Sequence, residues 1–438
     1  MHFDAMAYAE RTLRTRWLAL TLVALVLGVV GGCGGGGGGS KILYAVGLGS
    51  PNVAIFTVSS AGTLTFTGSV STGSAPDAIG IDPLLRFAYI VDSGGGIAPG
   101  GVSQYVLTRS TGVLTVATLP AANGTSSPST PIETGVGPAA LAIDGTGSFA
   151  FVANTGAIPP NSACSPTPSV CAPSLSVYTI DPTGGALTEV KQTPTSGPTP
   201  LNCMPNQPVP CPLPLPPSAV PGAPVVPAAL ATTGNMLFVA MTNAGMGSIA
   251  TYMFTPAPAT QSLTQVPCPT GPGCLQNLPA STIAAGTNPV AMAMGSSGNF
   301  LFVADSVANT VAAFSIGTSG QLSAVGTGNT GTTPVSVSVH PTGNFLYTVN
   351  QGGANCVNGS VSAFSISSGA LTALPNSPFA AGPCPSYVAI DSSGSFLFVA
   401  NGGTNNISVF SIDSSGALKP LSNSSFVVVN PIALASIN

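Results

Sequence analysis

The chain has 438 residues, of which 5% are charged, whereas about a quarter of the residues of an average soluble domain are charged. Its 8 basic and 12 acidic residues give a formal net charge of −4, which excludes the basic surface with which proteins track nucleic-acid phosphates. The 54 Gly and 42 Pro residues disfavour long helices and predict many turns.

The N-terminal segment has the pattern of a secretory signal peptide. A basic stretch that ends at Arg16 precedes an uncharged run, Trp17–Val30, which is short for a membrane-spanning helix. The run continues into Val30-Gly31-Gly32-Cys33, which resembles a bacterial lipobox, where an aliphatic residue and two small residues precede the acylated cysteine. We therefore expect a lipoprotein acylated at Cys33. The alternative is an ordinary signal peptide followed by an incidental cysteine.

The glycine run Gly34–Gly39 follows this cysteine and predicts a flexible tether. Gly34 stands where the retention signal of enteric lipoproteins has Asp, which favours the outer membrane or the cell surface. The expected organisation is a signal peptide over residues 1–32, a lipidated cysteine with its tether over 33–40, and one exported domain over 41–438.

The remaining cysteines form an even set, which predicts disulfides in an exported chain. A metal site is the competing interpretation. The segments around these cysteines contain no His, almost no carboxylate and no CxxC spacing, so we expect neither a metal nor a cofactor. Pairing of neighbours in the sequence would give Cys164–Cys171, Cys203–Cys211, Cys268–Cys274 and Cys356–Cys384.

One pattern recurs along the domain. Its clearest copy runs over Pro385–Asn401, Ile407–Ile412 and Gly416–Leu418. Each copy holds short segments rich in β-branched and aromatic residues, separated by Gly, Pro, Asn and Ser, which is typical of β-strands. We name these strands a to d in chain order, and the Gly between strands c and d is expected to adopt a positive φ. Four antiparallel strands repeated in this way form one blade of a β-propeller.

The number of copies predicts seven blades, closed between the two ends of the chain. The first copy starts at strand b, Ile42–Val46, and continues with strands c and d, Val53–Val58 and Leu64–Phe66. Its missing strand a is expected at Pro431–Ile437, and this sharing removes the exposed sheet edge of an open array. Complete copies begin at Pro76, Pro138, Pro227, Pro289, Pro334 and Pro385.

The recurring motif Pro-x-x-Val-x-x-x-x-x-Gly-x-Phe-Leu-Tyr/Phe-Val-x-Asn resembles that of the YVTN/lactonase-type propeller family, which includes 6-phosphogluconolactonase-like proteins. The resemblance extends from about Lys41 to Asn438. It implies an all-β, seven-bladed propeller with four antiparallel strands per blade. It also adds lactone hydrolysis as a candidate activity, although the motif residues belong to the scaffold.

The b–c and d–a connections of such a propeller lie on one face. The insertions Thr155–Pro173 and Thr193–Pro224 and all the paired cysteines are expected in these connections, with Cys356–Cys384 joining adjacent blades. We expect this face to carry binding. Polar residues that end the b strands would form a ring for a ligand or a cation there, or else hydrogen-bond the turns of their own strands. These residues are Asp92, Asn154, Asp305, Asn350 and Asn401.

A lactonase requires a general base and a positive group for its substrate, and the resemblance implies His, Glu and Arg in these roles. His340 lies in an a–b turn and is therefore expected on the opposite face. Glu133, in a d–a connection, is the one candidate for the base. Other copies carry an aspartate at the position of His340, namely Asp82, Asp144 and Asp391.

These observations favour a non-catalytic, monomeric propeller of the cell envelope, attached to the membrane through its N-terminal lipid. Its expected ligand is a carbohydrate, a peptide or an envelope protein. Lactone hydrolysis is the alternative function.

Overall fold

The computed structural model describes one compact unit within residues 39–438. The described residues are 41–49, 51–94, 99–120, 126–128, 131–156, 173–190, 213–215, 225–254, 275–421 and 427–437. The signal peptide, the lipobox with Cys33 and the glycine tether lie outside them. Among the described residues, no helix is long and apolar enough to cross a membrane.

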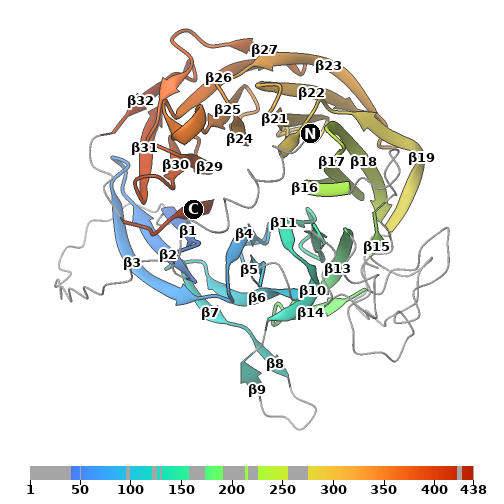
Figure 1. The fold of residues 1–438 in the computed structure, drawn as a ribbon. Coiled ribbons are helices and arrows are strands. Elements are labelled where there is room, and N and C mark those ends of the chain that lie inside the picture. Colours follow the sequence, from blue (N-terminus) through green and yellow to red (C-terminus); the bar gives the residue numbers. More distant parts are fainter. Residues whose placement is uncertain are drawn as a thin grey trace. The chain divides into compact units, whose positions relative to one another are not determined.

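Seven antiparallel sheets follow one another around a ring, and each runs from an inner strand a to an outer strand d (Figure 1). This arrangement confirms the predicted all-β, seven-bladed propeller. We number the blades in chain order, so that blade 1 contains β1 to β3. Strands a are β4 (Pro76–Ile81), β11 (Pro138–Ile143), β16 (Val225–Thr233), β20 (Pro289–Met294), β24 (Pro334–Val339), β29 (Pro385–Ile390) and β33 (Pro431–Ile437). Strands b are β1 (Lys41–Gly47), β5 (Phe87–Asp92), β12 (Phe149–Asn154), β17 (Met236–Asn243), β21 (Phe300–Asp305), β25 (Phe345–Asn350) and β30 (Phe396–Asn401).

The outer half of each blade consists of strands c and d. Strands c are β2 (Asn52–Val58), β6 (Pro99–Thr108), β13 (Ser174–Ile180), β18 (Met246–Phe254), β22 (Thr310–Ile316), β26 (Ser360–Ser367) and β31 (Asn406–Ile412). Strands d are β3 (Leu64–Ser71), β7 (Val113–Val116) with β10 (Ile132–Val136), β14 (Leu187–Glu189) with β15 (Leu213–Pro214), β19 (Leu275–Ala284), β23 (Leu322–Asn329), β27 (Ala370–Ala373) with β28 (Phe379–Ala380), and β32 (Leu418–Pro420). The described residues also include a hairpin of β8 (Thr118–Pro120) and β9 (Ser126–Pro128) and the short 3-10 helix η2 (Ala354–Cys356).

The b strands are apolar without alternation because both of their faces are covered. Every residue of β5, β12 and β30 is buried. In β5, Phe87 and Tyr89 pack against blade 3, whereas Ala88 and Ile90 pack against blade 1. The core therefore consists of apolar layers between adjacent blades, one for each of the seven blade pairs.

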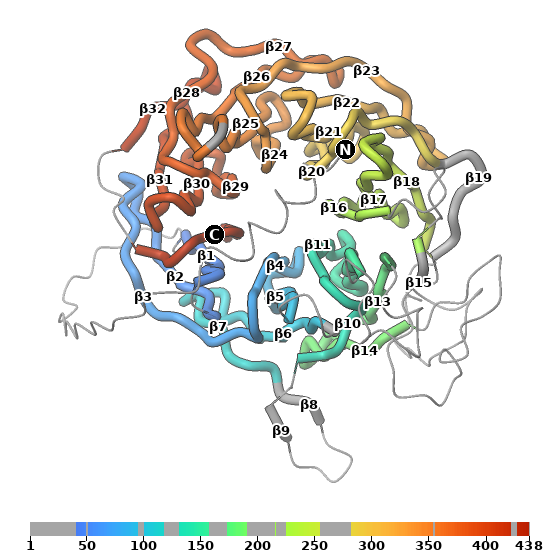
Figure 2. Tube along the Cα trace, in the orientation of Figure 1, coloured from blue at the N-terminus to red at the C-terminus, as the bar shows by residue number. Residues whose placement is uncertain are grey.

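The ring closes where the two ends of the domain pair. β1 pairs with β33 from Ile42 opposite Ile437 to Gly47 opposite Pro431. Blade 1 thus takes its inner strand from the C-terminal end of the chain, as predicted. In Figure 2 the blue and red parts of the tube meet at this blade.

The outer strands differ from the regular pattern. In blades 1, 4 and 5 the outer strand changes register along its length. In blades 2, 3 and 6 it breaks instead, and its second part is β10, β15 or β28. Insertions therefore interrupt the outer edge of a blade as well as its loops, because an exposed edge strand tolerates a break that a buried strand would not.

The expectation that all insertions belong to b–c and d–a connections is wrong for two segments. The segment Thr193–Pro224, with Cys203 and Cys211, contains β15, so most of it comes between β14 and β15, the two parts of the outer strand of blade 3, and not after that strand. Cys268 and Cys274 lie between β18 and β19, the c and d strands of blade 4, and therefore in a c–d connection. These four cysteines, with Cys164 and Cys171, lie outside the described residues, and their disulfides stay predictions.

Candidate functional site

The face that carries the b–c and d–a connections, called the b–c face below, is held by a repeated backbone contact. After a b strand, the next residue donates its N–H to the carbonyl of the residue that precedes the inner-strand proline. Ser93 donates to Ala75 and Gln351 to Thr333, both at 2.8 Å. The d–a connection thereby runs across the end of the b strand, and this crossing determines what the predicted ring residues contact.

The amide side chains of the ring, Asn154, Asn350 and Asn401, are fully buried. The Nδ2 of Asn350 donates to Ser360 Oγ and Ser362 Oγ on strand c of its own blade, at 3.1 and 2.9 Å. These bonds join the ends of strands b and c. The equivalent acceptors are Ser174 and Ser176 for Asn154, and Asn406 and Ser408 for Asn401.

A glycine of the d–a connection covers each of these amides. A Cβ on Gly135 would lie 2.8 Å from Asn154 Cγ, and a Cβ on Gly382 would lie 2.6 Å from Asn401 Cγ. Only glycine allows the backbone to approach so closely. The burial, the bonds within the blade and this cover favour the structural interpretation of the ring over a ligand-binding one.

Asp305 holds the same position in blade 5 as a carboxylate. Burial alone would raise its pKa, but the backbone N–H groups of Ala308, Thr287 and Asn288 donate to it and hold the pKa below its ordinary value. The N–H of Val307 and the hydroxyl of Thr287 donate as well. With these donors in place, the carboxylate has little capacity left for a cation.

Asp92 in blade 2 is a carboxylate that receives fewer hydrogen bonds than Asp305. Ser103 Oγ donates to its Oδ2 at 2.6 Å. Within the described part of the chain its buried Oδ1 has no hydrogen-bond partner, which is also true of the Oδ1 atoms of Asn154, Asn350 and Asn401. Burial raises the pKa of Asp92 to about 6; the bond from Ser103 opposes this rise and the neighbouring Asp77 carboxylate adds to it. Burial also raises the pKa of Asp77 to about 6, against the effect of a hydrogen bond with Ser93. Two carboxyl groups that exchange protons near neutral pH are suited to general acid–base chemistry.

Asp77 was missed in the analysis of the sequence, although a signal exists. It lies at the bulge between Pro76 and Ala78, one residue after the inner-strand proline. Blade 2 alone has an ionisable residue at this position, and a departure from a repeat is informative because the scaffold does not require it. The other blades carry Ala139, Ala228, Val290, Val335, Ser386 and Ile432 there.

Glu133 was expected in a d–a connection. It lies instead in β10, on the outer edge of blade 2. Its side chain is exposed, and its backbone carbonyl accepts a bond from Tyr178 Oη at 2.8 Å. The edge strand forms because Ile132 and Glu133 pair with Val102 and Gly101. Glu133 is therefore remote in the strand order from the inner strands that surround the axis.

His340 lies in an a–b turn, as predicted. Its ring packs beside the turn of the next blade, with Nε2 2.9 Å from the carbonyl oxygen of Gly394 and Nδ1 2.8 Å from Thr342 Oγ1. Arg86 and Lys41 are held at the same end of the strands by ion pairs with Asp82 and Asp391, each at 2.6 Å. Of the described basic residues, Arg109 and Lys419 also lie at this end, near c–d turns, so none of them faces the Asp77–Asp92 pair.

The predicted disulfide Cys356–Cys384 is present. It joins the b–c connection of blade 6 to the residue before the inner strand of blade 7, and so ties adjacent blades on the b–c face. Within the described residues, no three His, Cys, Asp or Glu side chains converge as metal ligands would.

Comparisons with known proteins agree with the fold. The family described as lactonase, 7-bladed β-propeller, matches residues 40–206, 273–357 and 317–428. A candidate 6-phosphogluconolactonase of Bacteroides fragilis has a TM-score of 0.68 at 17% identity, over 91% of this chain and 98% of that one. The periplasmic gluconolactonase of Pseudomonas aeruginosa has a TM-score of 0.66 at 19% identity, over 91% and 99%. Such identities show a shared fold. No curated protein matches the chain.

Proposed function

The chain belongs to the lactonase family of seven-bladed β-propellers, and from this premise we propose that it is an exported, lipid-anchored protein that binds an uncharged envelope ligand on its b–c face. The ligand is a carbohydrate, a peptide or a surface of another envelope protein. The protein acts as a monomer attached to the membrane through Cys33.

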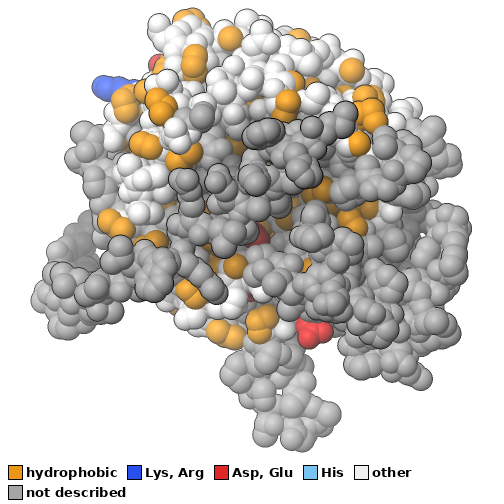
Figure 3. Space-filling view, viewed as in Figure 1, with side chains coloured by type: hydrophobic (Ala, Val, Ile, Leu, Met, Phe, Trp, Pro, Cys, Tyr) orange, Lys and Arg blue, Asp and Glu red, His pale blue; other side chains and the backbone are white. Residues whose placement is uncertain are grey.

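The observation that supports this proposal is a set of exposed aliphatic side chains on the b–c face. They lie in the b–c connections of blades 1, 5 and 6, at the first residue of β18 in blade 4, and in the segment before β33. Exposed apolar side chains that share one face can contribute to an interaction surface. Figure 3 shows few charged side chains among the described residues of the face in view. The residues, with their exposed fractions, are Leu48 (41%), Met246 (53%), Val307 (65%), Val357 (57%), Val427 (79%) and Val429 (45%).

The position of the first described residue supports the orientation of this surface. Lys41 Nζ lies 2.6 Å from Asp391 Oδ2, in the a–b turn of blade 7, and so at the end of the strands opposite the disulfide Cys356–Cys384. A tether that leads to Lys41 would leave from the a–b side. The b–c face of an anchored propeller would then point away from the membrane.

Binding is tested with the purified full-length chain against arrays of envelope polysaccharides and peptides. The double substitution Val307→Ser and Val357→Ser is expected to lower the affinity for the ligand that binds best about tenfold or more, because apolar contact area is lost. The matched control is Val325→Ser on β23, which alters a valine of 38% exposure away from this face. Equal affinities for the double variant and the control would contradict a binding surface on the b–c face.

Anchoring is tested by metabolic labelling with a radioactive fatty acid. The full-length protein is expected to carry the label and to sediment with membranes, whereas Cys33→Ser should lose both properties. A labelled Cys33→Ser variant, or an unlabelled native chain found only in the soluble fraction, would contradict lipidation at this residue.

Lactone hydrolysis remains a second candidate function because of the Asp77–Asp92 pair and because relatives of this fold carry the names 6-phosphogluconolactonase and gluconolactonase. One carboxylate would take a proton from a water molecule while the oxygen of that water forms a bond to the lactone carbonyl carbon. The ring acyl C–O bond would then break, and the other carboxyl group would protonate the leaving alkoxide, giving the hydroxy acid.

This candidate predicts hydrolysis of δ-gluconolactone above the spontaneous rate. Asp77→Asn and Asp92→Asn should each lower kcat at least about a hundredfold, since general acid–base groups contribute that much. Glu133→Gln, which changes an exposed carboxylate on the outer edge, is the control and should have no effect. Activity that survives both aspartate substitutions would exclude this pair as the catalytic groups.

A further inference from the structure

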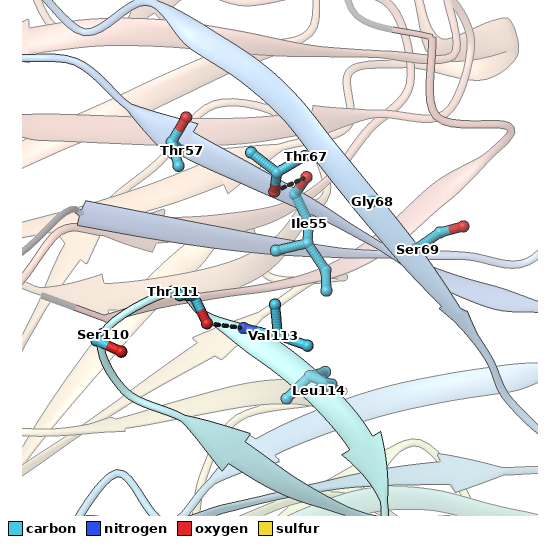
Figure 4. Close-up of a pocket in the computed structure, with 9 residues that line it drawn as sticks. All are labelled: Ile55, Thr57, Thr67, Gly68, Ser69, Ser110, Thr111, Val113 and Leu114. Atoms are coloured by element: carbon cyan, nitrogen blue, oxygen red, sulfur yellow. Dashed lines mark hydrogen bonds between the residues drawn. The ribbon is translucent and has the colours of Figure 1, made fainter. Parts of the chain in front are cut away.

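A groove lies on the outer part of the seam between blades 1 and 2, away from the b–c face proposed above. Its volume is about 500 Å³, and we call it the seam groove. Strands β2 and β3 of blade 1 form one wall, and the turn between β6 and β7 of blade 2 forms the other (Figure 4). Ile55 from one wall and Val113 and Leu114 from the other give the groove an apolar floor.

The groove exists because of a bulge in β3. Phe56 pairs with Phe66, but Ile55 pairs with Gly68, so that Thr67 is the extra residue. Gly68 has no side chain, and a Cβ there would meet nothing within 4 Å. The bulge and the missing side chain together open a notch in the outer strand.

Blade 5 provides an internal comparison. There the outer strand bulges at Val325, and Gly326, in the same register as Gly68, also faces open space. The hollow beside it has a volume of about 200 Å³. Pockets for small ligands have volumes of roughly 300–1,000 Å³. Of these two hollows formed by the same device, the seam groove is the one of ligand size.

Hydroxyl groups surround the apolar floor. Thr67 Oγ1 donates to the carbonyl of Ile55 at 3.1 Å, which leaves its lone pairs available. Thr111 Oγ1 accepts the N–H of Val113 at 3.3 Å, and its own hydrogen is weakly engaged, 3.5 Å from Thr108 O. Ser69 and Ser110 add two hydroxyls that have no hydrogen bond to any described residue. No charged side chain lines the groove.

This chemistry suits a neutral molecule that carries many hydroxyls on an apolar ring. Hydroxyl side chains both donate and accept, so they match sugar hydroxyls in either sense. Aliphatic side chains cover the C–H face of a pyranose, whereas an acid or a phosphate would require the cation that is absent from the lining. We propose that the seam groove is a binding site for a neutral saccharide of one or two units.

The test is titration of the full-length chain with cellobiose, maltose and glucuronate, followed by saturation-transfer NMR and calorimetry. Saturable binding of a neutral disaccharide in the millimolar range or tighter is expected. Gly68→Val fills the notch and should weaken the binding of the disaccharide at least about tenfold, because the valine side chain would overpack the groove when the sugar is bound. Gly326→Val places the same side chain at the equivalent bulge of blade 5 and should leave the affinity unchanged.

Ser69→Ala provides a second readout that perturbs the backbone less and should reduce affinity about fivefold through one lost hydrogen bond. The double variant of Val307 and Val357 should not change the affinity for the disaccharide. The proposal for the seam groove and the proposal for the b–c face are therefore tested independently of each other. The proposal is overturned if neither disaccharide binds, if glucuronate binds more tightly, or if Gly326→Val and Gly68→Val weaken binding equally.

Discussion

Asp92 occupies a position at which three other blades have an asparagine, and this difference has a measurable energetic effect. At all four positions the Oδ1 atom is buried without a partner in the described structure. The amides are neutral and donate to strand c, whereas Asp92 is a carboxyl group whose other oxygen accepts a bond from Ser103. With a folded pKa of about 6, against about 3.9 in the unfolded chain, its ionisation is disfavoured by folding. The stability due to the protonated group is complete below about pH 4 and is lost as the pH rises through about 6.

We therefore predict that Asp92→Asn raises the free energy of unfolding by about 2 kcal/mol at pH 7 and hardly changes it at pH 4. The measurement is urea denaturation from pH 4 to pH 8. Asp77 ionises in the same range, so the native protein should keep part of its pH dependence in the variant. A stability gain that is independent of pH would show that folding does not shift the pKa of Asp92.

Asp305→Asn is the same substitution at the same position in blade 5, and the opposite sign is expected. Several N–H groups point at this carboxylate and hold its pKa below the ordinary value, against the effect of burial. An amide NH₂ would repel some of these donors, so we predict a loss of about 2 kcal/mol at pH 7. The stabilising effect of the native carboxylate should disappear as the pH falls below the ordinary range of an aspartate. Equal effects at positions 92 and 305 would refute the assignment of their protonation states.

The contrast between these aspartates also shows what the sequence alone can predict at the scale of residues. The ring positions were recognisable because they end five of the seven b strands. The charge state of each side chain was not, because the deciding groups belong to the connections. Gly73 lies beside Asp92 in a d–a connection, and the donors to Asp305 come from Thr287 and Asn288 in a d–a connection and from Val307 and Ala308 in a b–c connection. These connections vary between copies, so no repeated motif describes them.

At the scale of elements, the turn between strands c and d couples neighbouring blades. Gly185 has a φ of +72°, and a Cβ there would lie 2.4 Å from the ring of Phe87 in the preceding blade. Its carbonyl accepts a bond from Tyr89 Oη at 2.9 Å. Tyr44 and Tyr347 make the same contact with Gly112 and Gly416, so the turn glycine serves both its own hairpin and the adjacent blade.

We predict that Gly185→Ala lowers the free energy of unfolding by about 3 kcal/mol, since backbone strain and a clash in the core add together. Gly245→Ala is the control. Gly245 has a similar φ of +77°, but nothing lies within 4 Å of its Cβ position, so only about 1 kcal/mol of strain is expected. Thermal or urea unfolding distinguishes the two. Losses of the same size would mean that the contact with Phe87 contributes nothing.

The elements were predictable from the sequence to different degrees, and burial explains why. The b strands are covered on both faces, so their apolar residues recur in every copy. Outer strands such as β23 are mostly exposed and face few packing constraints. Their breaks, the placement of Glu133 in β10 and the c–d position of Cys268 and Cys274 therefore left no signal in the repeat.

At the scale of the whole molecule, stability depends on closure, because every blade is packed between two others. β33 supplies Ala433, Leu434 and Ile437 to the layers on either side of blade 1. Without it, the paired edge of β1 would lie open and the two apolar layers would lose their inner residues. The effect should therefore extend beyond the single strand.

We predict that a chain ending at Asn430 loses about 5 kcal/mol or more of stability, from buried Leu and Ile side chains and the missing strand ladder, and that it self-associates through the open edge of β1. The measurements are urea unfolding and analytical ultracentrifugation. A synthetic peptide of residues 427–438, added in excess, should restore a cooperative transition and a monomer, because it can pair with β1 as β33 does. Deletion of residues 1–38, which precede the propeller unit in the chain, is the control and should leave the transition unchanged. If the truncated chain unfolds at the native midpoint, the pairing of β1 with β33 does not hold the ring together.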